Sequence, residues 1–321
     1  MPTERRTKAK HNRRPLTSGQ RKPTISIIGA GRLGTALALA LDGRGYRVEA
    51  IMARRLAHAR RASASLAAHT QPLSATQLDS LPPSSLIFIT TPDDHVALVA
   101  ARLAESLQKR GRFYEGRTAL HCSGALSSDV LSPLRKAGFH TGSMHPLVSI
   151  SEPRQGAESL RGAFYCVEGY QAAVRVARTV VRDLGGESFS IKSGDKALYH
   201  ASAVMASGHI VALFDIATEM LKRCGLTKMK ARAVLLPLMQ SMLANLSTVD
   251  AAHALTGTFA RADTATMRRH LDALGRGGVT DALEVYRLLG ARSLRLAEKL
   301  GVDMKVLKKM SRVLKDFEGG D

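Results

Sequence analysis

Short apolar runs alternate with longer amphipathic stretches through the first part of the chain. ISII (25–28), YRVEAIM (46–52), LIFIT (86–90) and RTALHC (117–122) have the composition of buried strands. GRLGTALALALDG (31–43), LAHARRASASLAA (56–68) and DDHVALVAARLAESLQ (93–108) place apolar residues at helical spacing. Strands that alternate with helices predict an α/β fold of the Rossmann type, a doubly wound and mostly parallel sheet covered by helices.

The pattern changes in the second half of the chain. AFYCVE (163–168) and ESFSI (187–191) flank a predicted helix over 174–184 and extend the sheet. After Lys192 one mostly apolar helical run is predicted from Asp195 to about Leu221, and further helices break at Gly225, Thr256–Gly257 and Gly275–Gly278. We therefore expect a basic tail over 1–23, a Rossmann-type domain over 24–191 and an all-helical domain over 192–318.

The apolar character of that first long helix has a consequence for assembly. A helix this apolar is buried nearly all round, and one small helical domain can hardly cover it. A second subunit would do so, which predicts a homodimer through the C-terminal helices. No run of about 18 uncharged apolar residues occurs, so no membrane span is predicted.

Charge and composition restrict the possible partners. The net charge is +20, and residues 1–24 hold eight basic residues and one acidic residue. Such a tail can bind phosphates by counterion release, but the chain has no Trp and 4% aromatic residues, and no nucleic-acid module is recognisable. Nucleic acid is therefore expected only as a weak contact of the tail. Three widely spaced cysteines and a polar N-terminus favour a reducing, cytoplasmic location.

A glycine motif, Gly29-x-Gly31-x-x-Gly34, follows the first predicted strand and opens the first helix. In this context the first glycine permits a tight turn, the second lets backbone approach a pyrophosphate, and the third lets helix and strand pack closely. The helix N-terminus, including Arg32 and Leu33, offers free N–H groups to phosphates. The motif predicts a dinucleotide site.

The end of the second predicted strand selects between the two pyridine dinucleotides. Arg54 and Arg55 stand where an acid usually binds the adenosine ribose, and Glu49 falls inside the strand. A guanidinium pairs with a 2′-phosphate, so NADP is favoured over NAD, although both arginines would also suit a solvated helix start. Thr91 and Pro92 follow another strand and are expected to line the nicotinamide side; Asp93 or Asp94 would cap the next helix.

Three later segments carry a family resemblance. They are HCSGALSSDVLSPLRKAGFHTGSMHPLVSI (121–150), DKALYHASAVMASGHIVALFDIA (195–217) and ALTGTFARADTATMRRHL (254–271). With the glycine motif, the chain resembles bacterial Rossmann-like proteins with a DUF2520 domain. That group is similar to the 6-phosphogluconate dehydrogenase C-terminal-like superfamily, near prephenate dehydrogenases, ketopantoate reductases and pyrroline-5-carboxylate reductases. The usual family motif LTGP.ARGD is LTGTFARAD here, so Thr258 and Ala262 replace Pro and Gly.

Candidate chemical groups lie on the long helix and on two loops. Lys196, His200 and Ser207 stand at i, i+4 and i+11. The resemblance implies that Lys196 is the general acid/base and His200 its partner, while the alternative is a solvated lysine and a core histidine. His145 and Ser123, each in a loop expected to follow a strand, would face the nicotinamide.

Two further predictions concern the pair Arg261 and Asp263 and the absence of a metal-binding pattern. Arg261 and Asp263 form a structural ion pair or bind an acidic substrate, and the structural pair is favoured. No cluster of His, Cys, Asp or Glu has metal-ligand spacing, so no metal is predicted.

Two functions follow from these features. The first is an NADP-dependent oxidoreductase that passes hydride between NADP(H) and a small, acidic hydroxy/keto or amine/imine substrate. The second is an NADP(H)-binding sensor or regulator without catalysis. No motif names the substrate or the direction of the reaction.

Overall fold

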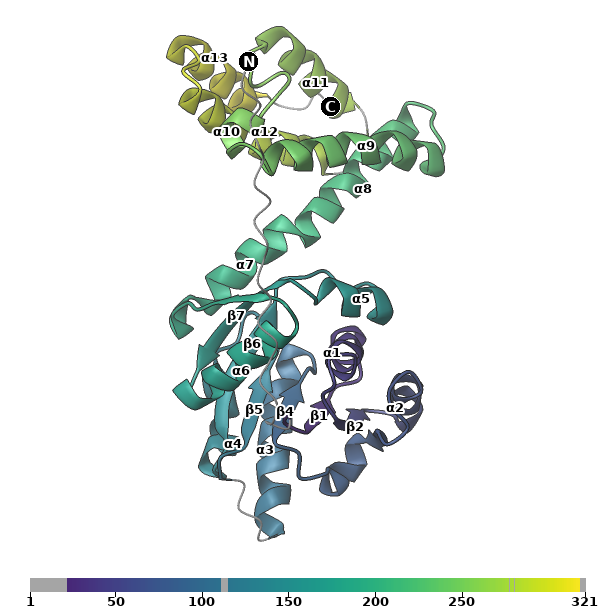
Figure 1. Ribbon diagram of the computed structural model, residues 1–321. Helices are drawn as coiled ribbons and strands as arrows, with labels where there is room; N and C mark the ends of the chain where they lie inside the picture. Colours follow the sequence, from purple (N-terminus) through teal and green to yellow (C-terminus); the bar gives the residue numbers. More distant parts are fainter. Residues whose placement is uncertain (1–21, 111–114, 277, 280, 318–321) are drawn as a thin grey trace, which may run out of the picture. The chain divides into compact units, whose positions relative to one another are not determined.

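The computed structural model describes residues 22–110, 115–276, 278–279 and 281–317. Most of the predicted basic tail therefore lies outside the described residues. The chain divides into two compact units, the first ending at Ala203 and the second beginning at Val204. This division falls within helix α7 (Lys196–Ala206), and Figure 1 traces the order of the elements by colour.

The first unit contains an eight-stranded sheet of order β3-β2-β1-β4-β5-β6-β7-β8. All neighbouring strands are parallel except the β6–β7 pair. This arrangement confirms the predicted Rossmann-type sheet. The strands are β1 (Ile25–Ile28), β2 (Val48–Ala53), β3 (Gln71–Ser74), β4 (Leu86–Ile89), β5 (Thr118–His121), β6 (His140–Pro146), β7 (Phe164–Gly169) and β8 (Glu187–Phe189).

Helices cover both faces of this sheet, which is why every residue of β1, β4 and β5 is buried. One face packs on α1 (Arg32–Asp42), α5 (Pro153–Ser159) and α6 (Gln171–Asp183). The other packs on α3 (Asp93–Lys109), α4 (Ser132–Lys136) and the short helices η1 (Ala75–Ser80) and η2 (Ser128–Leu131). Helix α2 (Leu56–Ser63) connects β2 to β3. Edge strand β3 was not predicted, because QPLS contains a proline and has no β-branched residue.

The second unit is helical, as predicted. Its elements are α8 (Gly208–Arg223), α9 (Lys228–Leu246), α10 (Ala251–Ala254), α11 (Thr264–Arg276), α12 (Ala282–Lys299) and α13 (Met304–Asp316). Its core joins α11, α12 and α13 through residues such as Met267, Leu294 and Met310.

The prediction of one continuous helix from Asp195 to Leu221 was wrong. Ser207 has φ −129° and ψ −77°, outside the helical range, and it separates α7 from α8. Ser207 therefore does not continue the face of Lys196 and His200 as the spacing assumed. Among the described residues, one span, Ser193–Arg223, has the length and composition to cross a membrane, and 6% of its most apolar window is buried.

The loop that precedes α11 departs from ordinary backbone geometry at one alanine. Ala262 has φ +51°, and it is the one non-glycine residue with positive φ in the described parts of the chain. The left-handed conformation is costly for a residue with a Cβ atom. The position is the one at which the family motif has glycine.

Candidate functional site

The glycine turn between β1 and α1 contains two glycines that the protein itself requires. Gly29 has φ +122°, and a Cβ there would lie 2.7 Å from the carbonyl carbon of Thr90. A Cβ on Gly34 would lie 1.9 Å from the carbonyl oxygen of Gly29. These contacts confirm the tight turn and the close helix–strand packing that the motif predicts.

Gly31 is different, because a Cβ built on it would meet nothing within 4 Å. Gly31 is also the N-cap of α1 and has no side chain with which to accept a hydrogen bond from the first turn. The N–H groups at this helix end therefore have no capping side chain among the described residues. Packing within the described residues therefore does not require glycine at position 31.

One cavity beside this turn has a volume of about 220 Å³ and carries the predicted Arg54. Gly29, Met52, Ala53, Thr91, His95, Leu98, Val99 and Arg102 are among its other lining residues. Arg55 is instead the N-cap residue of α2 and does not line the cavity. Sequence reasoning missed His95 and Arg102, although their spacing of seven residues on α3 places them on one helix face.

Thr91 lines this Arg54 cavity, and not the second cavity described next. The prediction that Thr91–Pro92 line the nicotinamide side stays a prediction. The Oγ1 of Thr91 is buried and has no hydrogen-bond partner within the described chain. Pro92 is the N-cap residue of α3.

A second cavity, of about 370 Å³, reaches the other residues of the turn, Arg32 and Leu33. It collects three of the predicted site residues, Ser123, His145 and His200. Asp93, Cys122, Gly124, Pro146, Val148 and Ile150 complete its lining. Residues far apart in the sequence thus meet at the carboxyl edge of the sheet, where ligands of such folds bind.

The two histidines of this cavity are close neighbours. The ring centroids of His145 and His200 are 5.4 Å apart, and Nδ1 of His145 lies 2.7 Å from the Tyr199 hydroxyl. Nδ1 of His200 is buried without a partner among the described residues. Gly124 makes this approach possible, because a Cβ there would lie 2.3 Å from that nitrogen and 2.8 Å from Nε2 of His145.

His145 lies at the next-to-last position of β6, and not in a loop after the strand as predicted. Burial lowers its pKa to about 4, and the positive charge of Lys196 acts in the same direction. The side chain is therefore neutral at physiological pH.

Lys196, the first residue of α7, is 1% exposed and lies behind the cavity wall. Its Nζ donates hydrogen bonds to the carbonyl oxygen of Ser123 at 3.2 Å and to Oγ of Ser143 at 3.1 Å. Burial lowers the pKa of this ammonium group. The solvated-surface interpretation of Lys196 is thus wrong, yet its side chain does not line the cavity.

The hydroxyl group of Ser123 stabilises the loop after β5. The hydroxyl donates to Asp93 at 2.7 Å and accepts from the N–H groups of Ala125 and Leu126. Asp93, the first residue of α3, is thereby tied to the loop after β5 instead of capping its own helix. These bonds hold the loop in place and do not prepare a nucleophile.

A buried acid, Glu168 of β7, was missed by sequence reasoning. It is 5% exposed and stands opposite Ser143 in the antiparallel β6–β7 register. Its carboxylate accepts from the hydroxyls of Ser128 at 3.1 Å and Ser193 at 3.0 Å. Ser193 belongs to the short helix η3 (Ser193–Asp195) directly before Lys196. The signal in the sequence was a glutamate inside the apolar strand FYCVEG.

His121 ends β5 and is completely buried. Its Nδ1 accepts from the N–H of Ser123, so its Nε2 carries the proton and donates to the carbonyl oxygen of Ser127 at 3.2 Å. Burial lowers the pKa of His121 to about 4. This histidine supports the loop that carries Ser123 and Gly124.

Two smaller predictions concern the loop before α11 and metals. No ion pair joins Arg261 to Asp263 in the described part of the chain; Asp263 instead accepts from the N–H of Thr266 in the first turn of α11. Within that same part, no group of three or more His, Cys, Asp or Glu side chains could hold a metal ion.

The sheet, the glycine turn and the helical unit define a Rossmann-type α/β protein with a helical C-terminal region. The Rossmann-like domain family matches residues 12–146, and DUF2520, a domain of unknown function, matches residues 163–293. The chain therefore belongs to the proteins that join a Rossmann-like domain to a DUF2520 domain. No curated protein matches the sequence.

Several solved structures share the fold. A candidate NADP oxidoreductase from Bacteroides fragilis is 21% identical with a TM-score of 0.69, over 85% of this chain and 98% of its own. A protein from Thermotoga maritima is 20% identical with a TM-score of 0.58, over 91% of this chain and 100% of its own. A reductive aminase from Aspergillus terreus, in complex with NADPH and ethyl levulinate, is 17% identical with a TM-score of 0.52, over 94% and 96%. At these identities the similarity establishes the fold.

Proposed function

We propose that this protein is an NADP(H)-dependent oxidoreductase that passes hydride between the coenzyme and a small hydroxy/keto or amine/imine substrate. One observation carries the proposal: a Cβ on Gly31 would meet no protein atom within 4 Å, α1 begins there without a capping side chain, and the residues before and after Gly31 line two cavities of different chemistry. A dinucleotide has this layout, because its diphosphate joins an adenosine half to a nicotinamide half.

The Arg54 cavity suits the adenosine half of NADP. Arg54 and Arg102 offer two guanidinium groups for a 2′-phosphate, and Leu98 and Val99 offer apolar surface for the base. No carboxylate lines this cavity, whereas NAD is usually held by an acid on its ribose. The unpartnered Oγ1 of Thr91 is a further polar atom that a ligand here would satisfy.

The second cavity suits the reacting end. When bound, the coenzyme would supply or accept the hydride beside His145 and His200. Nδ1 of His145 and the Tyr199 hydroxyl share a hydrogen bond whose donor depends on the imidazole tautomer. In the tautomer with Nδ1 as the acceptor, the proton is on Nε2, the nitrogen nearest to Gly124. A neutral imidazole in this state donates a hydrogen bond to a carbonyl oxygen or imine nitrogen and stabilises the negative charge that develops there.

Lys196 takes a different role from the one its spacing suggested. Its Nζ is buried and bonded to Ser123 and Ser143, so direct proton transfer from it to a substrate in the cavity is not favoured. Burial lowers the pKa of His145, and the ammonium form of Lys196 behind the wall adds to that shift and would stabilise developing negative charge. Arg32, exposed at the cavity edge, would bind an acidic group of the substrate.

The similar structures support this proposal without naming a substrate. They include proteins described as an imine reductase in complex with NADP⁺ and a pyrroline-5-carboxylate reductase, and both act on carbon–nitrogen bonds by name. The shared fold and the histidine-lined cavity are compatible with such a reaction.

Calorimetry with NADPH and NADH tests the coenzyme. We expect NADPH to bind more tightly, and Arg54→Gln to weaken NADPH by about 10-fold or more while leaving NADH unchanged, as expected for the loss of a charged hydrogen bond. Arg55→Gln is the matched control, since its neighbouring guanidinium does not line the cavity. Absence of binding heat with both coenzymes would overturn the proposal.

Turnover tests the chemistry. In a screen of keto acids and imines with NADPH, His145→Asn should lower kcat by about 10²–10⁴-fold with NADPH affinity retained. If the unaltered protein shows no turnover, and NADPH instead changes its affinity for another macromolecule, the sensor hypothesis replaces the enzyme hypothesis.

We also propose that a second copy of this chain covers α8 and α9. Large apolar side chains are exposed along both helices, namely Val211, Leu213, Met220, Val234, Leu236, Leu238, Leu243 and Leu246. Many large exposed apolar side chains on two packed helices favour an interface, and two-fold dimers are the commonest assemblies.

Sedimentation in detergent-free buffer tests the dimer. We expect twice the chain mass of 34.5 kDa, and a single-chain mass for Leu236→Glu/Leu243→Glu. Phe164→Glu, an exposed aromatic residue in the first unit, should leave the mass unchanged. A requirement for detergent would point to a membrane instead.

A further inference from the structure

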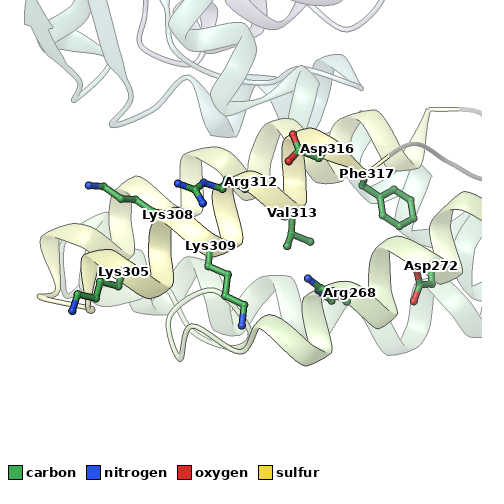
Figure 2. Close-up of a pocket in the computed structure, with 9 residues that line it drawn as sticks. All are labelled: Arg268, Asp272, Lys305, Lys308, Lys309, Arg312, Val313, Asp316 and Phe317. Atoms are coloured by element: carbon green, nitrogen blue, oxygen red, sulfur yellow. The ribbon is translucent and has the colours of Figure 1, made fainter.

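The helical unit contains a strongly basic hollow of about 700 Å³ between α11 and α13. Five cationic side chains border it, which we call the α13 basic cluster: Lys305, Lys308, Lys309 and Arg312 of α13, and Arg268 of α11. Figure 2 shows the three lysines at the N-terminal end of α13, while Asp272 and Phe317 lie at the other end of the hollow.

The fold dictates that these charges face outward. Leu307, Met310 and Leu314 are buried in the helical core together with Met267 and Leu271 of α11. The lysines and Arg312 stand at i, i+3, i+4 and i+7 on the remaining side of α13, and all are exposed. The helix is thus anchored by its apolar face and presents a row of positive charge to the outside.

These charges have no partner within the described chain. None of the five side chains makes a hydrogen bond or an ion pair there, whereas other surface cations, such as Lys109 with Glu105 and Lys222 with Glu219, are paired. Helices α11 and α13 together contain eight basic and two acidic residues. Unpaired like charges so close together repel one another, and an anionic partner would relieve that repulsion.

We infer that the α13 basic cluster binds the sugar-phosphate backbone of a nucleic acid. Lysine and arginine side chains neutralise backbone phosphates and release counterions, which gives binding without sequence preference. The chain has no Trp and few aromatic residues to stack on bases, so the contact is to phosphates only.

Two other anionic partners, an acidic protein surface and an anionic membrane, fit this surface less well. Lysine is depleted from protein–protein interfaces, yet three of the five cations are lysines. A membrane surface is bound by helices that insert an apolar face, but Leu307, Met310 and Leu314 are already buried in the core. The cluster lies in the second unit, and the inference does not depend on the proposed coenzyme site.

Fluorescence anisotropy of a labelled 20-base-pair duplex, titrated with the full chain over a salt series, tests the inference. The variant Lys308→Gln/Lys309→Gln/Arg312→Gln should bind at least 10-fold more weakly at low salt. The slope of log affinity against log salt should fall by about 2.7, because each lost phosphate contact removes about 0.9. Residual binding is attributed to the basic segment 1–24.

Arg175→Gln/Arg178→Gln/Arg182→Gln on α6 is the matched control, since it removes the same charge from an exposed helix in the first unit. Its affinity and salt slope should stay close to those of the unaltered chain, and thermal melts should show that both variants fold. Equal loss in both variants would overturn the inference, because only net charge would matter. Binding to phosphatidylserine vesicles without binding to the duplex would also overturn it, in favour of a membrane.

Discussion

The ammonium nitrogen of Lys196 lies 3.1 Å from the hydroxyl oxygen of Ser143, in the buried layer behind the histidine-lined cavity. Ser143 of β6 stands opposite Glu168 of β7 in the ladder, so Lys196 of α7 donates to the residue paired with the buried acid. Burial lowers the pKa of Lys196, and the negative charge of Glu168 opposes that shift. A residue that lines neither the Arg54 cavity nor the histidine cavity therefore contributes to the pKa of Lys196.

Glu168→Gln should move the pH dependence of turnover. Without the carboxylate, the pKa of Lys196 falls further, and activity that needs the ammonium form is lost at lower pH. We expect the alkaline limb of kcat/KM to shift to lower pH. Ser193→Ala, which removes one donor to Glu168 but keeps the charge, should leave the limb in place. A uniform loss at every pH would show that Glu168 is only structural.

Gly31→Ala and Gly34→Ala should separate ligand binding from folding. The added methyl at 31 meets no protein atom, so the melting temperature should stay the same while NADPH binds at least 10-fold more weakly. The methyl at 34 would collide with the backbone of Gly29 and should lower the free energy of unfolding by about 1–3 kcal/mol or more. Unchanged NADPH affinity in Gly31→Ala would contradict the proposed diphosphate site.

Acid should destabilise the first unit through His121. Its pKa is about 4 in the folded chain, below its ordinary value of 6.5, so between these values the unfolded chain binds a proton that the folded chain does not. The free energy of unfolding should therefore fall as pH drops from 6.5 towards 4, by up to about 1.4 kcal/mol per pH unit.

Denaturant titrations of His121→Gln over the same pH range measure this contribution. The variant should lose part of the slope, and the remainder is expected from His145, which has a similarly lowered pKa. His58→Gln, on the exposed side of α2, serves as the control and should keep the full slope. An unchanged slope in His121→Gln would refute the assignment.

Ala262→Gly should stabilise the helical unit. Ala262 has φ +51°, a conformation that costs an alanine about 1–2 kcal/mol and glycine little. Part of the gain is offset by the larger entropy of glycine in the unfolded chain, so we expect about 0.5–1 kcal/mol in chemical denaturation. Ala260→Gly, in the same loop without positive φ, should be destabilising. A less stable Ala262→Gly would show that the loop gains nothing from glycine.

Local patterns predicted the fold well where a signal spans several residues. The run ISII, the glycine motif and the apolar rhythm of Arg32–Asp42 specify a strand, a turn and a helix together, and all three form as predicted. Strand β3 was not predicted, because QPLS is neither apolar nor β-branched. The break at Ser207 was not predicted either, because a serine between two apolar segments carries no signal for a helix end.

The sequence by itself determined that a sheet with a glycine turn would form and that Arg54 would follow β2, because these depend on neighbours along the chain. Only the tertiary structure decided which distant residues share a cavity. The separation of Thr91 from His145, the burial of Lys196 behind Ser123 and the pairing of Ser143 with Glu168 all follow from strand order and register. A spacing along the chain fixes a helix face, but it does not reveal what packs against that face.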